Sequence, residues 1–147
     1  MRRILPALAV LLALALSACG EASLTTEQLH DRAAAICTRT ATATDRIAMP
    51  NTPAQADRFL QQGLAELRPA TAELRALKAP TDVRERYDRA VQLAGQELAL
   101  IARHERAIAH GDDVSDTYRH LDAALEPLLR QENAYWRALQ LEACVRR

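Results

Sequence analysis

The stretch VRERYDRAVQLAGQELALIARHERAIAHG, residues 83–111, is the clearest sign of how this 147-residue chain folds. Its apolar residues recur every three or four positions, and charged residues fill the gaps. This spacing is that of an amphipathic helix with one buried face. Thr81 can cap the start of the helix, and Gly111 can end it because glycine readily adopts the left-handed conformation. The apolar stripe is Val83, Tyr87, Val91, Ala94, Leu98, Ile101 and Ile108.

Three further segments have the same periodicity. The first begins at Thr25 or Thr26, although Thr38 to Thr44 is a weak helix former. The second follows Thr52, with Pro53 in the first helical position, where its missing N–H costs nothing. The fourth opens at Asp112, Asp113 and Ser115. The remaining stripes are Leu29, Ala33, Ile36, Cys37 and Ile47 in the first helix, Phe59, Leu60, Leu64, Leu67, Leu74 and Leu77 in the second, and Val114, Tyr118, Leu121, Leu125, Leu128, Tyr135 and Leu139 in the fourth.

The predicted fold is therefore all-α. No window alternates with a period of two, so strands are not expected. Four amphipathic helices with short connections predict an antiparallel four-helix bundle. Pro69 and Pro127 lie inside the second and fourth helices, and we expect each to kink its helix.

The N-terminus has the layout of a secretory signal peptide. Arg2 and Arg3 precede an apolar run, residues 4–16, that is shorter than the roughly 20 residues of a membrane span. The residues Leu16-Ser17-Ala18-Cys19 resemble the lipobox of bacterial lipoproteins. An ordinary signal sequence with a chance cysteine and an uncleaved span remain the alternatives. The residues around the arginine pair do not match the twin-arginine motif, so general secretion is expected.

The lipobox resemblance implies a domain division and a location. Residues 1–18 would be a lipoprotein signal peptide, and Cys19 would become the first residue and carry a diacylglyceryl anchor. Residues 19–24 would form a lipidated tether of at most about 17 Å, and 25–147 a helical bundle domain. The protein would then sit on the extracytoplasmic face of the cell membrane or the outer membrane, with the membrane as its first partner.

The cysteine count agrees with this division. The chain has Cys19, Cys37 and Cys144, and an odd number in an exported protein needs an explanation. If Cys19 is lipidated, Cys37 and Cys144 remain to pair in an oxidising compartment. The alternative is two buried free thiols that pack as small apolar groups.

A straight, in-register bundle would conflict with this disulfide. Cys37 would lie about 18 Å from the Met49 end of the first helix, whereas Cys144 would lie at about 45 Å. A bridge needs Cα atoms within about 7 Å. A kink at Pro127, a fold-back near Gln140 or an early end of the first helix around Thr40 would each relieve the conflict.

The residues Ala138-Leu139-Gln140-Leu141-Glu142-Ala143-Cys144 resemble the C-termini of small helical secreted proteins of unknown function from high-GC bacteria. Such proteins often carry a Leu-Gly-Leu step before a final cysteine that pairs with one in the first helix. Gln140 stands where that glycine would be. The resemblance implies the topology and the disulfide, but no activity.

No pattern of catalytic residues stands out, and we expect neither an enzyme nor a cofactor. Glu27 and His30 form a single Glu-x-x-His, whereas di-iron bundles need two copies. Asp116 and His120 can share a helix face, but a solvated pair is the simpler interpretation, so no metal site is predicted. A hydrolytic enzyme is only a remote alternative.

The charges are balanced. Basic and acidic residues number 19 each, and loss of Arg2 and Arg3 would leave the mature chain slightly acidic, so nucleic acid is not an expected partner. Glu97 is one of several acids interleaved with arginines on what looks like a solvated face of the third helix. Glu105 and Glu132 flank apolar stripes and could form a buried polar layer, although such positions usually extend to water.

Two functions are carried forward. The leading one is a non-enzymatic lipoprotein that binds or scaffolds an envelope protein near the membrane, with Tyr135 and Trp136 as candidate partner-binding residues. Both could instead pack against the first helix. The alternative is a carrier of a small ligand or metal, with a pocket between the helices. An exposed apolar patch at Trp136 would favour the first function, and a closed internal cavity lined by Tyr87, Tyr118 or Glu132 would favour the second.

Overall fold

The computed structural model describes residues 23–146, which form four α-helices and one short 3-10 turn. The helices are α1 (Thr26–Thr44), α2 (Pro53–Ala76), α3 (Arg84–Ala109) and α4 (Val114–Ala138), and the turn is η1 (Glu142–Cys144). The described part of the chain contains no strand, and none of its helices is long and apolar enough to cross a membrane. The predicted signal peptide, Cys19 and most of the tether lie outside the described residues. The predicted all-α bundle is confirmed.

Side-chain caps open two of the four helices, whereas Thr52, although it occupies the N-cap position of α2, makes no side-chain capping bond. Thr25 accepts a hydrogen bond from the Gln28 backbone, and the Gln28 side chain accepts one from the Thr25 backbone, so a complete capping box opens α1. Asp113 caps α4 by accepting from the Asp116 backbone. The expected cap at Thr81 is wrong: residues 81–83 form a turn, and α3 begins only at Arg84.

The weak segment at the end of α1 is helical, and its threonine hydroxyls bond to backbone carbonyls within the helix. The hydroxyls of Thr40, Thr42 and Thr44 donate to the carbonyl oxygens four residues earlier, at 2.8 to 3.0 Å. Such bonds satisfy the hydroxyls within the helix. α1 ends at Thr44, so the early end near Thr40 does not occur.

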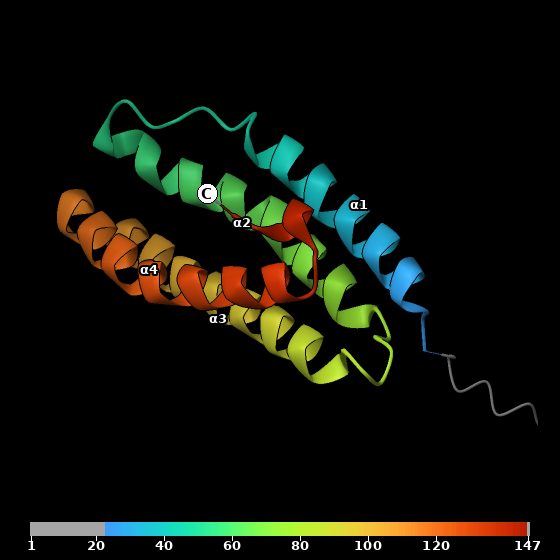
Figure 1. Ribbon diagram of the computed structural model, residues 1–147. Helices are drawn as coiled ribbons and strands as arrows, with labels where there is room; N and C mark the ends of the chain where they lie inside the picture. The colour runs from blue at the N-terminus through green and yellow to red at the C-terminus, as the bar shows by residue number, and fades with distance from the viewer. Residues whose placement is uncertain (1–22, 147) are drawn as a thin grey trace, which may run out of the picture.

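The helices are unequal in length, and this divides the bundle into two ends. α1 has 19 residues whereas α2, α3 and α4 have 24 to 26. Figure 1 shows that α1 stops part of the way along the bundle and that residues 45–52 continue as an extended connection to the start of α2. Only α2, α3 and α4 therefore pack around the core at the far end.

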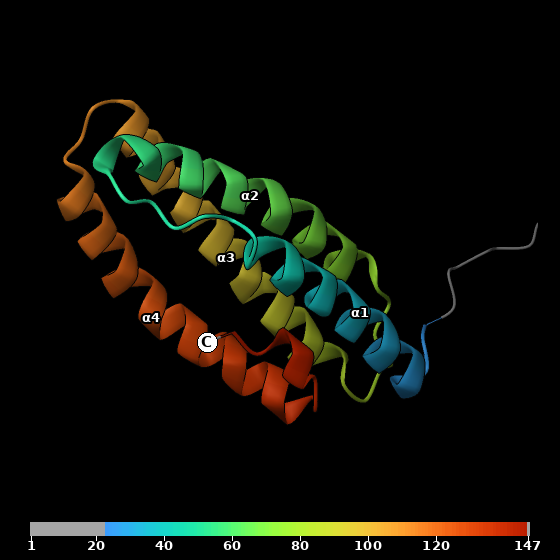
Figure 2. The same cartoon turned by 90° about the horizontal axis from the view of Figure 1, so that it is seen from above.

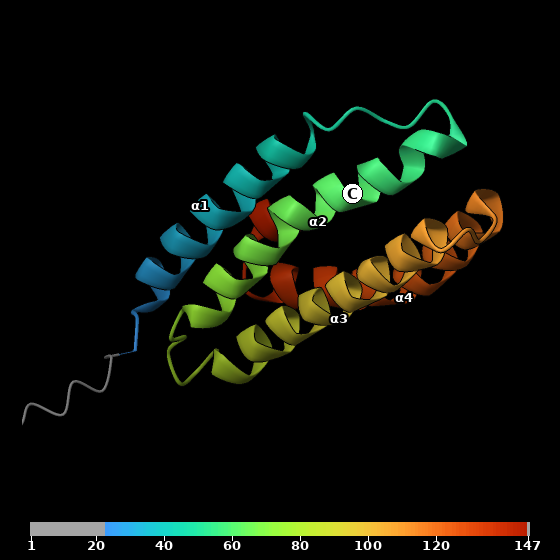
Figure 3. The ribbon, with the colours of Figure 1, turned by 180° about the vertical axis from the view of Figure 1, so that it is seen from behind.

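Helices that are consecutive in sequence pack together, but the ring does not close through α1 and α4. Among the described residues α1 contacts α2 and η1, and not α3 or α4. Figure 2 shows the C-terminal segment lying between α1 and α4. From behind, α2 and α3 lie side by side in front of that segment (Figure 3). The returning tail takes the place that a direct α1–α4 contact would have in a regular bundle.

The tail returns because α4 ends in a tight left-handed turn. Gln140 has φ 58°, the Gln140 N–H bonds to the Arg137 carbonyl at 2.9 Å, and the Leu141 N–H bonds to the Trp136 carbonyl at 2.9 Å. These two bonds form a Schellman motif. Gln140 therefore plays the part usually taken by glycine. Of the three ways to relieve the geometric conflict, this fold-back is the one that brings the tail to α1.

The predicted disulfide is present. Cys37 on α1 and Cys144 in η1 are bridged, with their Cα atoms 5.0 Å apart, within the range that a disulfide requires. Pro69 and Pro127 lie inside α2 and α4, and both helices continue through them. The disulfide thus depends on the reversal of the chain after α4.

The buried side chains form two clusters of different size. The disulfide-end cluster contains the two largest fully buried side chains, Trp136 and Tyr87, whereas the far-end cluster has three buried members, Leu60, Leu100 and Leu121. Full burial of one large apolar side chain is worth about 1.5 to 3 kcal/mol. Most of the stabilising burial therefore lies at the disulfide end. Its buried members are Leu29, Ala33, Ile36, Ala70, Leu74, Ala79, Tyr87, Ala90, Val91, Trp136, Leu139, Leu141 and Cys144.

Candidate functional site

A cavity of about 500 Å³ lies beside the disulfide, where the four helices and the tail meet. It is open on one side, and its wall is mostly apolar. This volume is within the range of small-molecule sites. The residues that line it are Ile36, Cys37, Thr40, Ala41, Thr44, Asp45, Leu67, Ala70, Thr71, Leu74, Ala94, Glu132, Trp136, Ala143, Cys144, Val145 and Arg146.

The cavity exists because the packing there is loose in two ways. The tail wedges between α1 and α4, so these helices do not close on each other. In addition, four of the lining residues are alanines, Ala41, Ala70, Ala94 and Ala143, whose side chains fill little space. The space is therefore a consequence of the fold-back at Gln140 and of small residues on α1, α2, α3 and the tail.

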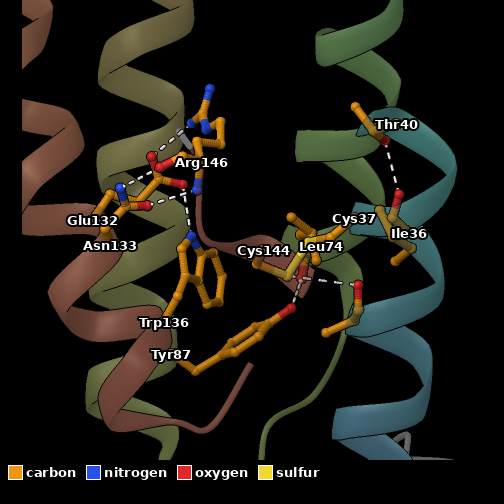
Figure 4. Close-up of a disulfide and its surroundings, with 11 residues drawn as sticks. Ile36, Cys37, Thr40, Leu74, Tyr87, Glu132, Asn133, Trp136, Cys144 and Arg146 are labelled. Atoms are coloured by element: carbon orange, nitrogen blue, oxygen red, sulfur yellow. Dashed lines mark hydrogen bonds and ion pairs between the residues drawn. A yellow bond between two sulfur atoms is a disulfide. The ribbon is translucent and has the colours of Figure 1, made fainter. Parts of the chain in front are cut away.

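Trp136 is fixed in the core and presents part of its surface to the cavity. Its side chain is 1% exposed and makes an edge-to-face contact with Tyr87, with ring centroids 5.8 Å apart. The Tyr87 hydroxyl donates to the Leu74 carbonyl at 2.7 Å, and burial, with a smaller effect of Asp88, raises the pKa of Tyr87. Trp136 Nε1 donates to Glu132 Oε1 at 2.8 Å (Figure 4). The indole therefore has a defined orientation.

Arg146 holds the tail against α4. Its backbone N–H donates to Asn133 Oδ1 at 2.9 Å, and Asn133 Nδ2 donates back to the Arg146 carbonyl at 2.7 Å (Figure 4). The guanidinium Nη2 lies 2.6 Å from Glu132 Oε2 and 2.5 Å from Glu97 Oε2. α3, α4 and the tail each contribute one ionisable group, so this cluster holds the tail in addition to the disulfide.

Glu97 is the most unusual member of this cluster. Its side chain is 1% exposed, and neither of its oxygens accepts a hydrogen bond from the described residues, although Oε2 forms an ion pair with Arg146. Burial first, and then the neighbouring Glu132, raise the pKa of Glu97 to about 9 against the opposing effect of Arg146. Burial and the neighbouring Glu132 thus favour the protonated form of Glu97 in the folded protein.

The structure corrects the expectation for the aromatic pair on α4. Trp136 is buried in the disulfide-end cluster, so it does not form an exposed patch for a partner. Tyr135 is half-buried at the edge of the same cluster and lines a shallow surface groove with polar residues of α3. For Trp136, the structure agrees with the alternative prediction, in which the side chain packs in the core. Among the described residues Met49 is the one large apolar side chain that is fully exposed.

The acidic residues behave differently from each other. Glu132 is buried, as a polar layer requires, but the second acid beside it is Glu97 and not Glu105. Glu105 is half-buried and accepts a hydrogen bond from Gln61 at 3.2 Å. The sequence placed Glu97 on a solvated face, and this was wrong. Glu97 lies three residues after the buried Ala94, and that spacing was the available signal.

The candidate metal motifs from the sequence do not gather into sites. In the described part of the chain no group of three or more potential metal ligands lies together. Asp116 pairs with Arg119 at 2.5 Å. Comparison with protein families, curated proteins and solved structures finds no match to this chain.

Proposed function

We propose that this protein is a non-enzymatic, lipid-anchored binding protein of the extracytoplasmic face, and that it holds a small amphipathic molecule in the cavity beside the disulfide. The observation that carries the proposal is the cavity of about 500 Å³ lined by Glu132 and Trp136. A closed cavity lined by Tyr87, Tyr118 or Glu132 was the feature expected of a small-ligand carrier; this cavity is lined by Glu132 and is open on one side. The buried position of Trp136 removes the patch on which the scaffold hypothesis depended.

The construction of the cavity supports binding of a molecule with one polar end. Most of its wall is apolar, and its ionisable lining groups are few: Asp45, Glu132 and Arg146. Small-molecule sites commonly combine an apolar wall with a few placed polar groups. The disulfide and the Arg146 cluster hold the wall in place, so little ordering is needed on binding.

The membrane part of the proposal rests on the lipobox. An anchor at Cys19 places the start of α1 near the membrane, and Leu24 N–H donates to the Lys78 carbonyl at 2.8 Å, so the α2–α3 connection lies at the same end. The α1 residues that line the cavity, Ile36 to Thr44, lie roughly 15 to 27 Å along the helix from Thr26. The cavity would then open above the headgroups, within reach of soluble ligands.

The anchor is tested by Cys19→Ala. We expect this variant to lose acylation and signal cleavage, and to change its membrane retention. An unlipidated mature N-terminus at another residue, found by intact-mass analysis of the wild-type protein, would exclude the anchor.

Ligand binding is tested by native mass spectrometry of protein purified from its own host. Ala41 is exposed on α1 and lines the cavity, so Ala41→Phe should block it. Ala35 is exposed on the same helix outside the cavity, so Ala35→Phe is the matched control. We expect an added mass on the wild type and on Ala35→Phe that Ala41→Phe lacks. An added mass that survives in Ala41→Phe would place the ligand elsewhere, and no added mass on the wild type would remove the proposal.

A further inference from the structure

The ionisable groups of the cavity have an excess of acid. Glu132 lies at its inner wall and Asp45 lines it at the end of α1, whereas Arg146 is the single basic group in the lining. Arg46 follows Asp45 but does not line the cavity. The nearby Arg39 and Glu73 pair with each other at 2.6 Å, so they add no net charge. An anionic ligand would meet two carboxylates and one guanidinium.

The end of α1 adds to this negative character. The last turn of α1 contains no basic residue, and its C-cap is Asp45. A helix C-terminus carries a partial negative charge that a cation normally offsets. Here Ala41, Thr44 and Asp45 all line the cavity, so the negative end of the helix lies at the cavity wall with no cation in its last turn.

The buried acid Glu97, which contacts Arg146, leaves the cluster with one carboxyl group more than it has cations. Glu97 is nine-tenths buried or more and has no aligned hydrogen-bond donor among the described residues. The charged groups that act on it are Glu132 from α4 and Arg146 from the tail. Two carboxyl groups thus share one guanidinium. Burial and Glu132 raise the pKa of Glu97, so a proton on Glu97 can take the place of the missing positive charge.

We propose that the ligand is an amphipathic organic cation, an apolar body bearing a protonated amine, whose ammonium group pairs with Glu132 while Arg146 turns fully to Glu97. This inference rests on the proposed ligand-binding function and names its chemical class. On binding, the proton of Glu97 leaves to solvent, and the four charged groups then balance as two acids and two cations. The apolar body occupies the space between Leu67, Leu74 and Trp136.

The experiment compares three probes that share one alkyl chain: octylammonium, octanol and octanoate, each below its micelle concentration. The chain contains a single tryptophan, and Trp136 lines the cavity, so its fluorescence reports binding directly. At pH 7 we expect octylammonium to bind at least about tenfold more tightly than octanol, because a buried charge-assisted contact is worth that much. Octanoate should bind most weakly.

The variants separate the charge from the fold. Glu132→Gln should bring the octylammonium-to-octanol ratio close to one. Glu126→Gln, on the exposed side of α4 where Glu126 pairs with Arg130 at 3.2 Å, should leave the ratio unchanged. If Glu132→Gln does not fold, Asp45→Asn at the exposed end of α1 should still lower the octylammonium affinity about twofold to threefold, as expected for a partly screened charge.

Proton release gives a second readout. Because the cation replaces the proton of Glu97, octylammonium affinity should rise from pH 6 to pH 8, and titration calorimetry in two buffers should detect the released proton. Tightest binding by octanoate would overturn the inference in favour of an anion site at Arg146, and equal binding of all three would reduce the site to an apolar cavity. Both results leave the ligand-binding function standing. If none of the three probes binds, the inference of a cationic ligand is overturned. The native mass spectrometry of wild type and Ala41→Phe then tests the ligand-binding function separately.

Discussion

The two ends of the bundle are built from the same kind of helix but differ in what closes them. At the disulfide end, the tail, η1 and α1 add a layer over the three long helices, and the core contains Trp136 and Tyr87. At the far end α2, α3 and α4 pack around three buried leucines, with partly buried apolar residues at the edge. The comparison shows that a short first helix and a returning tail can together cover the core, as one long helix would in a regular bundle. It also places the cavity at the more strongly held end.

Of the features that distinguish the two ends, the disulfide should contribute most to the free energy of unfolding. The bridge closes a loop of 107 residues, and the chain-entropy model assigns such a loop about 4 to 5 kcal/mol. We expect the double variant Cys37→Ala, Cys144→Ala to lose about that much unfolding free energy in urea. A loss below about 1 kcal/mol would mean that the Arg146 cluster alone holds the tail.

Core truncation should affect the two ends unequally. Trp136→Ala removes the largest buried side chain of the disulfide end and should cost about 3 to 5 kcal/mol. Leu128→Ala removes a partly buried side chain of the far end and should cost less than about 2 kcal/mol, because full burial of a leucine is worth only about 1.5 to 3 kcal/mol. Thermal and urea unfolding measure both. Equal losses would contradict the assignment of stability to the disulfide end.

Much of the fold follows from local sequence signals. Capping residues such as Thr25 and Asp113 and the 3.6-residue stripes locate four helices, and the cysteine count pairs Cys37 with Cys144. Thr81 failed as a cap because a turn with a Val83 N–H to Pro80 carbonyl bond delays the helix. Local signals therefore predict that a helix is present more reliably than they predict the residue at which it begins.

The candidate site was harder to predict because it depends on the tail. Glu97 stands among arginines and other acids in the sequence, and this pattern is typical of a solvated face. Its burial follows from α4 and Arg146 packing over it, which depends on the left-handed turn at Gln140. Arg146 has no local signal of its own. The polar cluster is therefore a consequence of tertiary structure.

The buried acid makes the stability of the disulfide end dependent on pH. The pKa of Glu97 rises from 4.5 to about 9 on folding, so the folded state binds its proton more tightly than the unfolded state. The contribution of this group is therefore full below about pH 4.5 and is lost as pH rises toward 9. Between pH 5.5 and 8.5 we expect the free energy of unfolding to fall by up to about 1 kcal/mol per pH unit.

Glu97→Gln keeps a neutral, similarly shaped side chain and should remove most of this slope. Glu126→Gln, at an exposed surface ion pair, should keep the wild-type slope. Urea unfolding at several pH values measures all three proteins. A flat wild-type profile over this range would show that Glu97 ionises in the folded protein without penalty, with Arg146 as its full partner.

The smallest expected effects compare the two left-handed turns, one at each end. Gly111 follows α3 with φ 97°, and Gln140 follows α4 with φ 58°, and both turns have the same pair of Schellman bonds. A left-handed non-glycine residue costs about 1 to 2 kcal/mol, whereas glycine costs about 0.5 to 1 kcal/mol in backbone entropy. A Cβ at Gly111 meets nothing within 4 Å, so Gly111→Ala tests conformation alone and should destabilise by about 1 kcal/mol. Gln140→Gly should stabilise by up to about 1 kcal/mol for the converse reason. Melting curves of the two variants measure this pair. If Gln140→Gly instead destabilises, the Gln140 side chain contributes more to the closed tail than its backbone strain costs.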